Sequence, residues 1–446
     1  MNIGKKLTGG HFLALSFFIL IIVGMLLLKL PASSHTGTSW TDALFTATSA
    51  VCVTGLIVVD TPVHFTFFGQ MVILVLIQFG GIGIMTFAAY FIFIFNKKLS
   101  LSNRIMMESS FVQGSSQIKL SGLLKFIVKY TFIFEAAGVV SFMLFLNEAN
   151  FGKRFYFSVF HAVSAFCNAG FSTYSDSLMT YNDNVAVNIT TMMLIIAGGI
   201  GFLVAFEIRS KITEILFKRR KIKKFKNYYT FSLHTWLVLL TSGILIFSGA
   251  ILIYFIELYS GSGTTYMQSL FQSVTARTAG FNTIDISTLN KGTQMIIVAL
   301  MFIGGSPGSA AGGIKTTTFA IIVSMMLMGR NNFEDLVIRN RQLTKRTVFQ
   351  ALTVFTFAFV IVFATVILIM IFDSQHAGIS IIFESVSAFG TVGLSTGITS
   401  ELNMVSKFVI TFTMFCGRVG PLTIFSIFLI KTKTTEVYAS DRVLTG

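Results

Sequence analysis

Phe383-Glu-Ser-Val-Ser-Ala-Phe-Gly-Thr-Val-Gly-Leu394 is the stretch that decides the fold, because its last four residues are one of four similar turns in the chain. The turns read Val53-Thr54-Gly55-Leu56, Asn168-Ala169-Gly170-Phe171, Thr278-Ala279-Gly280-Phe281 and Thr391-Val392-Gly393-Leu394. Their glycines lie 115, 110 and 113 residues apart, and each turn follows a short segment rich in small and hydroxyl-bearing residues. A sustained internal period indicates a protein built from tandem copies of one unit.

The composition is that of a membrane protein. Of the 446 residues, 54% are hydrophobic and only 11% are charged, whereas soluble domains contain about 25% charged residues. The first apolar run, His11 to Leu30, leads into Pro31 without a small-residue cleavage site, so we expect a retained helix. The cysteines are far apart in apolar surroundings and lack metal-ligand spacing, which predicts buried thiols. They are Cys52, Cys167 and Cys416.

The apolar segments predict the architecture. A spanning helix needs about 20 apolar residues. Eight segments qualify: 12–30, 68–95, 126–146, 185–208, 232–257, 293–328 (broken), 349–372 and 404–430. Each pair encloses an apolar stretch too short to span: 41–53, 153–167, 266–277 or 378–390. We therefore expect an all-α polytopic membrane protein with four tandem helix–pore-loop–helix repeats around one pseudo-fourfold pore. The expected boundaries are 1–100, 101–228, 229–346 and 347–430 for the repeats and 431–446 for a cytoplasmic tail.

The charges predict the orientation. The net charge is +15, and 24 of the 33 Lys and Arg lie in the tails and in loops 96–125, 207–227 and 329–346. The positive-inside rule places these segments, and both termini, on the cytoplasmic side of the cell membrane. The basic run from Lys218 to Lys224 is then an anchor beside acidic lipid or a partner, which argues against nucleic-acid binding.

The four turns predict an ion filter. Non-helical backbone at membrane depth is tolerated where it lines a watery cavity or is buried in protein. The C-terminal end of each half-length helix carries a partial negative charge, so four converging ends favour a cation. Carbonyl groups of four loops replace the hydration shell of K⁺ in channel filters, and the fourth turn is close to the Thr-Val-Gly-Tyr-Gly of those filters. The predicted filter residues are Cys52, Val53, Thr54, Gly55, Cys167, Asn168, Ala169, Gly170, Thr278, Ala279, Gly280, Thr391, Val392 and Gly393. Re-entrant loops without transport are the alternative that the fourfold period disfavours.

The second helix of each repeat carries a glycine motif. Gly80-Gly-Ile-Gly83 and Gly198-Gly-Ile-Gly201 are typical of small-residue helix packing. The third motif contains Pro307 and five glycines, which cannot form a regular helix. We expect an intramembrane loop over 304–318 that obstructs the pore and acts as a gate. The predicted gate residues are Gly304, Gly305, Ser306, Pro307, Gly308, Ser309, Gly312, Gly313, Lys315 and Thr316.

Charged residues within apolar segments are functional candidates. Arg418 lies beside the fourth glycine motif, where a positive charge below the filter would slow cations. The alternative is a structural arginine paired with a carboxylate or with carbonyls. We expect Arg277 to anchor the third turn from behind, Glu135 to brace helices and Glu384 to bind loop backbone. His161 is expected to be structural.

These features together resemble the superfamily of Trk, Ktr and HKT potassium transporters. The resemblance rests on the four helix–loop–helix units, the four turn glycines, the Gly-Ser-Pro-Gly loop and Arg418, and it is closest to the ion-translocating (KtrB-like) membrane subunit of bacterial Ktr systems. It implies potassium uptake through a channel-like pore, often promoted by Na⁺, and a homodimer in the membrane. It also implies a cytosolic KtrA-like regulatory ring that binds ATP, ADP or a dinucleotide. In that superfamily, glycine rather than serine at the position of Gly55 goes with K⁺.

Two other classes of membrane protein share some of these features. A secondary active cation transporter, coupled to H⁺ or Na⁺, would also use broken helices, often in inverted repeats. Here the repeats share one topology, which favours a central pore. A membrane enzyme needs convergent His, Asp, Ser or Cys groups, and the loops supply no such set. The chain also has no strand–Gly-x-Gly-x-x-Gly–helix unit, so we expect no cofactor bound by this chain and any nucleotide control to come from a separate subunit.

Overall fold

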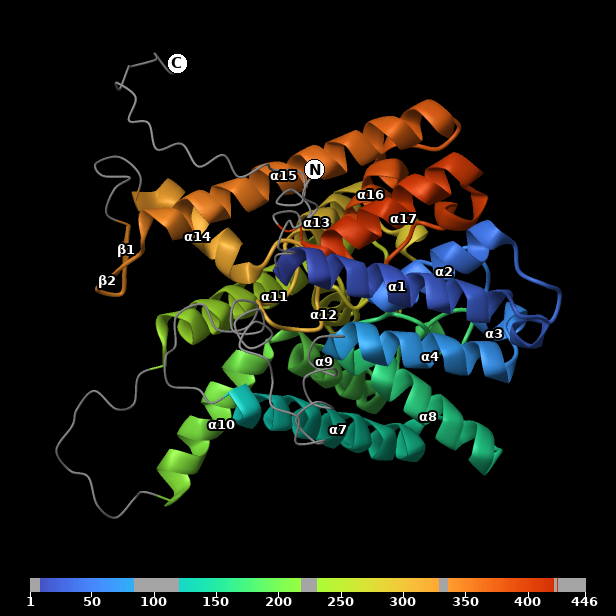
Figure 1. The fold of residues 1–446 in the computed structure, drawn as a ribbon, viewed down its shortest axis with the longest axis horizontal. Coiled ribbons are helices and arrows are strands. Elements are labelled where there is room, and N and C mark those ends of the chain that lie inside the picture. The colour runs from blue at the N-terminus through green and yellow to red at the C-terminus, as the bar shows by residue number, and fades with distance from the viewer. Residues whose placement is uncertain (1–8, 84–119, 218–230, 329–335, 421–422, 424–446) are drawn as a thin grey trace, which may run out of the picture.

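The computed structural model describes residues 9–83, 120–217, 231–328, 336–420 and 423. Within these residues the fold is a set of helices in four similar groups (Figure 1). Each group has a long first helix, a half-length pore helix and a second helix. The first helices are α1 (Gly9–Lys29), α7 (Leu120–Phe145), α11 (Leu233–Ser260) and α15 (Lys345–Phe372). The pore helices are α2 (Trp40–Cys52), α8 (Phe151–Phe166), α12 (Tyr266–Thr275) and α16 (Gly378–Gly390). The second helices are α4 (Phe67–Ile82), α9 (Val185–Gly199), α13 (Lys291–Phe302) and α17 (Met404–Val419).

Shorter elements complete the described chain. The helices α10 (Phe202–Phe217) and α14 (Thr316–Met328) continue α9 and α13 after a break, and α3 is Thr61–His64. The 3₁₀ helices are η1 (Pro31–Ser33), η2 (Met179–Tyr181), η3 (Ile286–Thr288) and η4 (Ile398–Glu401). One small hairpin pairs β1 (Val337–Ile338) with β2 (Arg341–Gln342), antiparallel, and the sequence did not predict it.

Three of the four pore helices begin at a side-chain cap, whereas α16 follows Ala377, which provides none. Ser39, Asn150 and Thr265 accept a hydrogen bond from the third backbone N–H of α2, α8 and α12. At α12 the cap is a full capping box, because the Gln268 side chain also binds the Thr265 backbone N–H. Such caps satisfy donors that a helix start would otherwise leave unpaired. The predicted half-length helices are therefore confirmed to within two residues at each end.

The second helices differ from the prediction. Continuous helices over 68–95, 185–208 and 404–430 were expected, but α4, α9 and α17 end at their glycine motifs. Gly83, Gly201 and Gly420 have φ of +86°, +94° and +93°, a left-handed backbone that glycine adopts readily and that ends a helix. At the second break, α10 leaves α9 at 100°. Residues 84–95, 421–422 and 424–430 of the expected helices lie outside the described residues. The predicted break in 293–328 is confirmed.

Four described helices are long and apolar enough to cross a membrane, or five if the bent pair α9–α10 counts as one span. They correspond to the first helix of each repeat. Their outward faces expose large apolar side chains, for example Leu144 on α7, Phe255 on α11 and Phe363 on α15. Among the described residues, the breaks in the second helices leave fewer continuous spans than the eight that were predicted.

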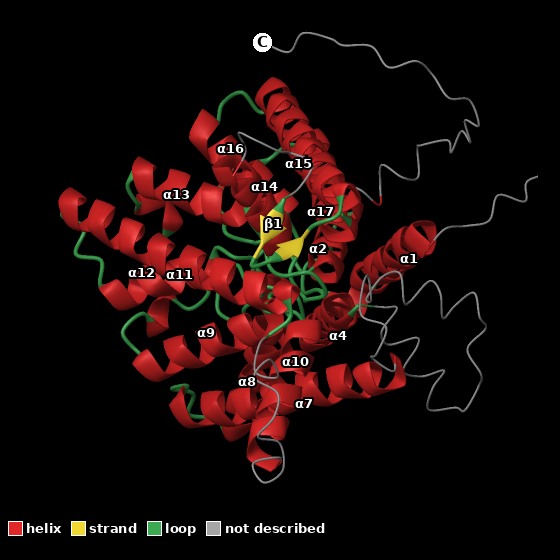
Figure 2. Cartoon of the chain, turned by 90° about the vertical axis from the view of Figure 1, so that its left-hand side faces the viewer, coloured by secondary structure: helices red, strands yellow, loops and turns green. Residues whose placement is uncertain are grey.

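The repeats close into a ring. Each second helix contacts the pore helix of the following repeat: α4 packs on α8, α9 on α12, α13 on α16, and α17 on α2. The last contact joins the fourth repeat to the first, so the cycle is complete. Viewed from the side of Figure 2, helices surround a central group of loops. The predicted all-α fold with four repeats around one centre is confirmed.

Candidate functional site: a ring of four turns above a loop

Each pore helix ends in a turn with unusual backbone geometry. The residue two before each turn glycine is left-handed: φ is 57° at Val53, 60° at Asn168, 80° at Thr278 and 50° at Thr391. For a β-branched residue this conformation is an outlier. Such strain persists only where the surroundings enforce it, and it concentrates at functional sites. The turns are therefore held in shape by the fold rather than by local preference.

The four turn glycines form a closed cycle, called here the glycine ring (Gly55, Gly170, Gly280 and Gly393). All four have positive φ. A Cβ added to any of them would overlap a carbonyl oxygen of the next turn: Ala169, Ala279, Val392 and Thr54, in ring order. The ring therefore has no room for a side chain. All fourteen predicted filter residues are brought together at or beside it.

One hydroxyl in each pore helix braces its turn. Ser49, Ser164 and Thr275 donate to the carbonyl of the residue after the turn glycine, at 2.7, 2.7 and 2.6 Å. In the fourth repeat Ser387 accepts from the Gly393 N–H at 3.1 Å. Thr275 lies five residues before its glycine, whereas the other three lie six before theirs. The third turn is therefore one residue shorter, a difference that is hidden when the repeats are aligned by their glycines.

A cavity of about 520 Å³ opens onto the glycine ring. All four ring glycines line it, together with the loops that follow the turns, and we call it the vestibule. Its charged lining residues are Asp60, Asp176 and Asp285, and none of its lining residues is basic. An acidic, concave surface raises the local cation concentration. The arrangement favours cations at the entrance to the ring.

Below the fourth turn lies the segment that was predicted as a gate. Its non-helical part is Ile303–Lys315 rather than 304–318, because residues 316–318 already belong to α14. We call Ile303–Lys315 the intramembrane loop. The two ends of this loop are joined by a β-bridge between Ile303 and Ile314. A Cβ at Gly312 would overlap the Thr391 side chain, so the loop packs directly against the fourth turn.

The loop is also bonded to the break between α9 and α10. Three backbone hydrogen bonds join them: Ser306 N–H to Gly199 O (3.1 Å), Ala310 N–H to Gly198 O (3.2 Å) and Phe202 N–H to Gly308 O (2.9 Å). The Lys315 ammonium turns back onto the loop and donates to Ala311 O at 2.7 Å. The loop is thus held by the second repeat on one side and packs on the fourth turn on the other.

Arg418 connects the loop to the first repeat. Its guanidinium donates to Ala310 O in the loop and to Gly80 O in α4, and it lies over the Phe17 ring at 5.9 Å. Both hydrogen-bond partners are carbonyls, as one of the two sequence interpretations held. The positive charge nevertheless lies below the glycine ring, so the pairing and a role in the pore are compatible.

Arg277 anchors the third turn, as predicted. It is 8% exposed and donates to Gly304 O (3.3 Å) and Ser242 O (3.5 Å). Gly304 is the first glycine of the intramembrane loop, so Arg277 joins the third turn to that loop. In the other repeats, the residue two after the bracing hydroxyl is Val51, Phe166 or Phe389, whose carbonyl packs on a glycine of the second helix.

A family model named TrkH and described as a cation transport protein matches residues 11–437. This chain belongs to that family. The Ktr system potassium uptake protein B of Bacillus subtilis (strain 168) is 40% identical, over 99% of this chain and 97% of the relative. The potassium/sodium uptake protein NtpJ of Enterococcus hirae is 36% identical, over 100% of this chain and 99% of the relative. The crystal structure of the potassium transporter TrkH from Vibrio parahaemolyticus shares the fold, with a TM-score of 0.72 at 19% identity, covering 96% and 87% of the two chains.

Membership of the TrkH family and the apolar helices make the chain a multi-pass membrane protein. Among the described residues, no group of three or more His, Cys, Asp or Glu side chains could hold a metal ion. At the centre of this TrkH-family fold, the carbonyl oxygens of Thr54, Ala169, Ala279 and Val392 lie beside the ring glycines. The three cysteines are free and buried, as predicted.

A carboxylate behind the second turn braces two helices, as predicted for Glu135. Gln78 on α4 donates to Glu135 on α7 at 3.2 Å, and the Cys167 thiol donates to Gln78 at 3.6 Å. Cys167 directly follows α8. The second turn is therefore connected through Gln78 to the first helix of its own repeat.

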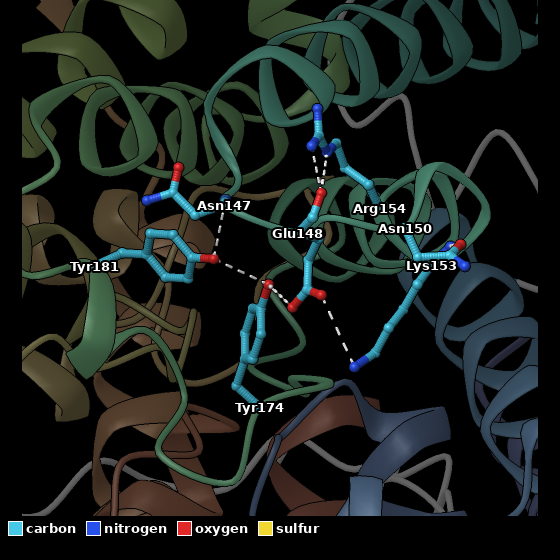
Figure 3. A network of polar contacts seen from close by, with 7 residues as sticks. All are labelled: Asn147, Glu148, Asn150, Lys153, Arg154, Tyr174 and Tyr181. Carbon is cyan, nitrogen blue, oxygen red and sulfur yellow. Dashed lines mark hydrogen bonds and ion pairs between the residues drawn. The ribbon is translucent and has the colours of Figure 1, made fainter.

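A second network holds the outer loop of the same repeat (Figure 3). The Tyr174 hydroxyl donates to the Glu148 carboxylate at 3.4 Å and lies 3.2 Å from the Tyr181 hydroxyl. Lys153 pairs with the same carboxylate at 3.8 Å, and Arg154 Nε donates to the Glu148 carbonyl at 2.7 Å. Burial, followed by the Tyr181 and Glu148 contacts, raises the pKa of Tyr174. Tyr174 is therefore a neutral phenol that can donate to the carboxylate.

Proposed function

We propose that this protein mediates K⁺ uptake across the cell membrane through a channel-like pore centred on the glycine ring. One observation carries the proposal: four turns of backbone close into a ring at the base of an acidic vestibule. The naming of full-length relatives as potassium uptake proteins supports it.

The turn backbone supplies the ion site in this proposal. The C-terminal ends of α2, α8, α12 and α16 lead into the turns, so their partial negative charges favour a cation there. Carbonyl groups of the turns replace water around K⁺. We propose that the fourteen filter residues predicted from the sequence line the ion site. The four glycines allow the turns to approach one another closely.

The intramembrane loop is the proposed gate. It lies against the fourth turn and is held by the α9 break and by Arg418, contacts that can be made or lost as a unit. Arg418 adds a positive charge that slows cations below the ring. Opening would require the loop to leave Arg418 and the α9 carbonyls.

Further parts of the proposal concern regulation and assembly. The name of one relative includes sodium as well as potassium, which supports Na⁺ as an activator. The word "system" in the names of the Ktr relatives supports a separate regulatory subunit, proposed here as a cytosolic ring that binds ATP, ADP or a dinucleotide. We also propose a homodimer, cytoplasmic termini, and repeat boundaries at residues 100, 228, 346 and 430.

Ion flux in proteoliposomes tests this function. The purified protein should take up K⁺ down a K⁺ gradient alone, faster with Na⁺ present, and expression should restore growth of cells deficient in K⁺ uptake. A strict requirement for a Na⁺ or H⁺ gradient would show that the protein is a symporter and not a channel. The absence of any K⁺ flux would reject the function.

A further inference from the structure

The four pore helices carry a buried polar side chain at one equivalent position. It lies three residues before the bracing hydroxyl of each repeat, and in every repeat it is at most 2% exposed. The four residues are Thr46, His161, Gln272 and Glu384. The four repeats thus share a buried polar side chain at this position, but its chemical type differs from repeat to repeat.

In the second repeat this side chain binds the segment beyond the turn. His161 Nδ1 lies 2.8 Å from Phe157 O, which places the ring proton on Nδ1. Its Nε2 then has no proton and accepts from the Ser172 hydroxyl at 3.0 Å, in competition with Ser177 O, which lies 3.2 Å from the same hydroxyl. Ser172 also accepts from the Tyr174 N–H at 2.9 Å. His161 therefore fixes the backbone two residues after Gly170.

The fourth repeat reaches the same result with a carboxylate. Glu384 Oε1 accepts from the Ser395 hydroxyl (2.5 Å) and from the Thr396 N–H (3.0 Å). Its Oε2 accepts from the Thr399 hydroxyl at 2.8 Å. Ser395 lies two residues after Gly393, as Ser172 lies two after Gly170. A buried carboxylate with three donors is a strong and directional brace.

The first and third repeats lack the brace. The Thr46 hydroxyl and both amide atoms of Gln272 have no hydrogen-bond partner within the described part of the chain. The residues two after the ring glycines are Ile57 and Asn282. Ile57 offers no polar group, and the Asn282 amide donates to Ile284 O instead. The pore helices of these two repeats therefore make no side-chain hydrogen bond from this position to the segment beyond the turn, within the described residues.

The braced turns lie opposite each other. The glycine ring has the order Gly55, Gly170, Gly280, Gly393, so Gly170 and Gly393 are each next to Gly55 and Gly280. We propose that His161 and Glu384 are positioning residues that hold one diagonal of the filter at a fixed width and so set its discrimination between K⁺ and the smaller Na⁺. A fixed diagonal keeps opposite carbonyls from closing around a smaller ion, while the other diagonal adjusts as ions pass. This inference rests on the proposed K⁺ filter.

The brace of the second repeat continues to the outer surface. The Tyr174 ring stacks on His161, with centroids 5.2 Å apart and planes at 25°. The Tyr174 hydroxyl then enters the network of Glu148 and Tyr181 (Figure 3). The second turn is therefore anchored to the loop between α7 and α8 as well as to its own pore helix.

The ratio of K⁺ to Na⁺ influx into proteoliposomes tests the brace of the fourth repeat, with one variant of each hydrogen-bond partner. Glu384→Gln removes acceptors at nearly constant shape, and Ser395→Ala removes a donor on the vestibule side. Each should lower the ratio of K⁺ to Na⁺ influx by roughly five- to tenfold, the scale of one hydrogen bond. The double variant should be no worse than the more affected single variant, because both changes break one interaction. His161→Gln and Ser172→Ala should behave in the same way.

The unbraced repeats provide the matched control. Thr46→Val removes a buried hydroxyl that has no partner in the described structure, and the influx ratio should not change. Unchanged ratios in Glu384→Gln and Ser395→Ala, or a double variant whose loss is the product of the two single losses, would overturn the inference. An equal loss in Thr46→Val would also overturn it. A wild-type protein without K⁺ flux would instead reject the proposed function. Ser395→Ala, on the vestibule side, keeps the test valid if Glu384→Gln does not fold.

Discussion

Arg418 and Ala310 are joined by a hydrogen bond from the guanidinium to the loop carbonyl, across 108 residues of sequence. A second hydrogen bond from Arg418 reaches Gly80 O in the first repeat. One side chain of the fourth repeat thus ties the intramembrane loop of the third to α4. Because this one guanidinium joins the loop to α4, the loss of Arg418 should free the loop from the first repeat.

Arg418→Gln should raise K⁺ influx by about tenfold, the scale of a charge-assisted hydrogen bond. The neutral amide removes the positive charge below the ring and weakens the hold on Ala310. Rubidium influx into proteoliposomes measures the effect. Arg418→Lys, which keeps the charge but cannot reach two carbonyls with one planar group, should give a smaller rise. An influx equal to wild type in both variants would leave Arg418 with a purely structural role.

Replacing Gly304–Gly313 by two glycines should raise K⁺ influx more than any point substitution in the loop. The bridge between Ile303 and Ile314 brings the two cut ends together, so a short linker can rejoin them. The variant should lose dependence on Na⁺ and on the regulatory subunit if these act through the loop. Influx at the wild-type level in a protein that elutes as a single species would refute the gate.

Gly198→Ala should destabilise the protein, because the added Cβ would overlap the Phe166 carbonyl at the end of α8. Gly80 packs in the same way on Val51 O, so the helix-packing interpretation of the first two motifs is confirmed, and Gly417 of the fourth motif packs likewise on Phe389 O. We expect the free energy of unfolding to fall by about 2 kcal/mol or more, as at other overpacked sites. Gly243→Ala on α11, where a Cβ meets nothing within 4 Å, is the control. Thermal unfolding in detergent measures both, and equal midpoints would contradict the packing argument.

The sequence predicted the local features of the site well. The turn motif and the half-length apolar stretches gave the pore helices, because chain length, caps and apolar character are local properties. Pro307 and its neighbouring glycines likewise predicted the intramembrane loop. The breaks at Gly83, Gly201 and Gly420 were missed, since a glycine in an apolar run is equally compatible with close helix packing.

Other features of the site depend on tertiary contacts and could not be predicted. The shorter third turn becomes visible only when Thr275 is seen to donate to Phe281 O as Ser49 does to Leu56 O. The partners of Arg418 come from two distant repeats, so spacing along the chain carries no signal for them. Arg277 was predicted to anchor the third turn from behind and Glu384 to bind loop backbone, and Glu384 accepts from the Thr396 N–H. The partners of Arg277, Ser242 O and Gly304 O, lie 35 and 27 residues away, so the sequence could not name them.

Gly55→Ser should raise the KM for K⁺ and lower its preference over Na⁺. The residue has φ of +90°, and a Cβ would overlap the Ala169 carbonyl of the next turn, so serine must displace a group that lines the ring. Gly37→Ser is the matched control, because Gly37 has φ of +81° but open space around it. Strain alone would affect both variants equally. Equal KM values for wild type, Gly55→Ser and Gly37→Ser would argue against the filter assignment.

Arg277→Gln should loosen the connection between the third turn and the intramembrane loop, since the guanidinium joins Gly304 O to the end of α12. We expect a rise in K⁺ influx of roughly five- to tenfold, corresponding to one lost hydrogen bond, with reduced discrimination against Na⁺. Arg154→Gln is the matched control, because Arg154 also donates to a carbonyl, that of Glu148, but on the outer loop. In the protein with Gly304–Gly313 replaced, the substitution should have no further effect on influx, because its partner carbonyl is gone. An undiminished effect in that background would show that Arg277 acts on the third turn alone and not through the loop.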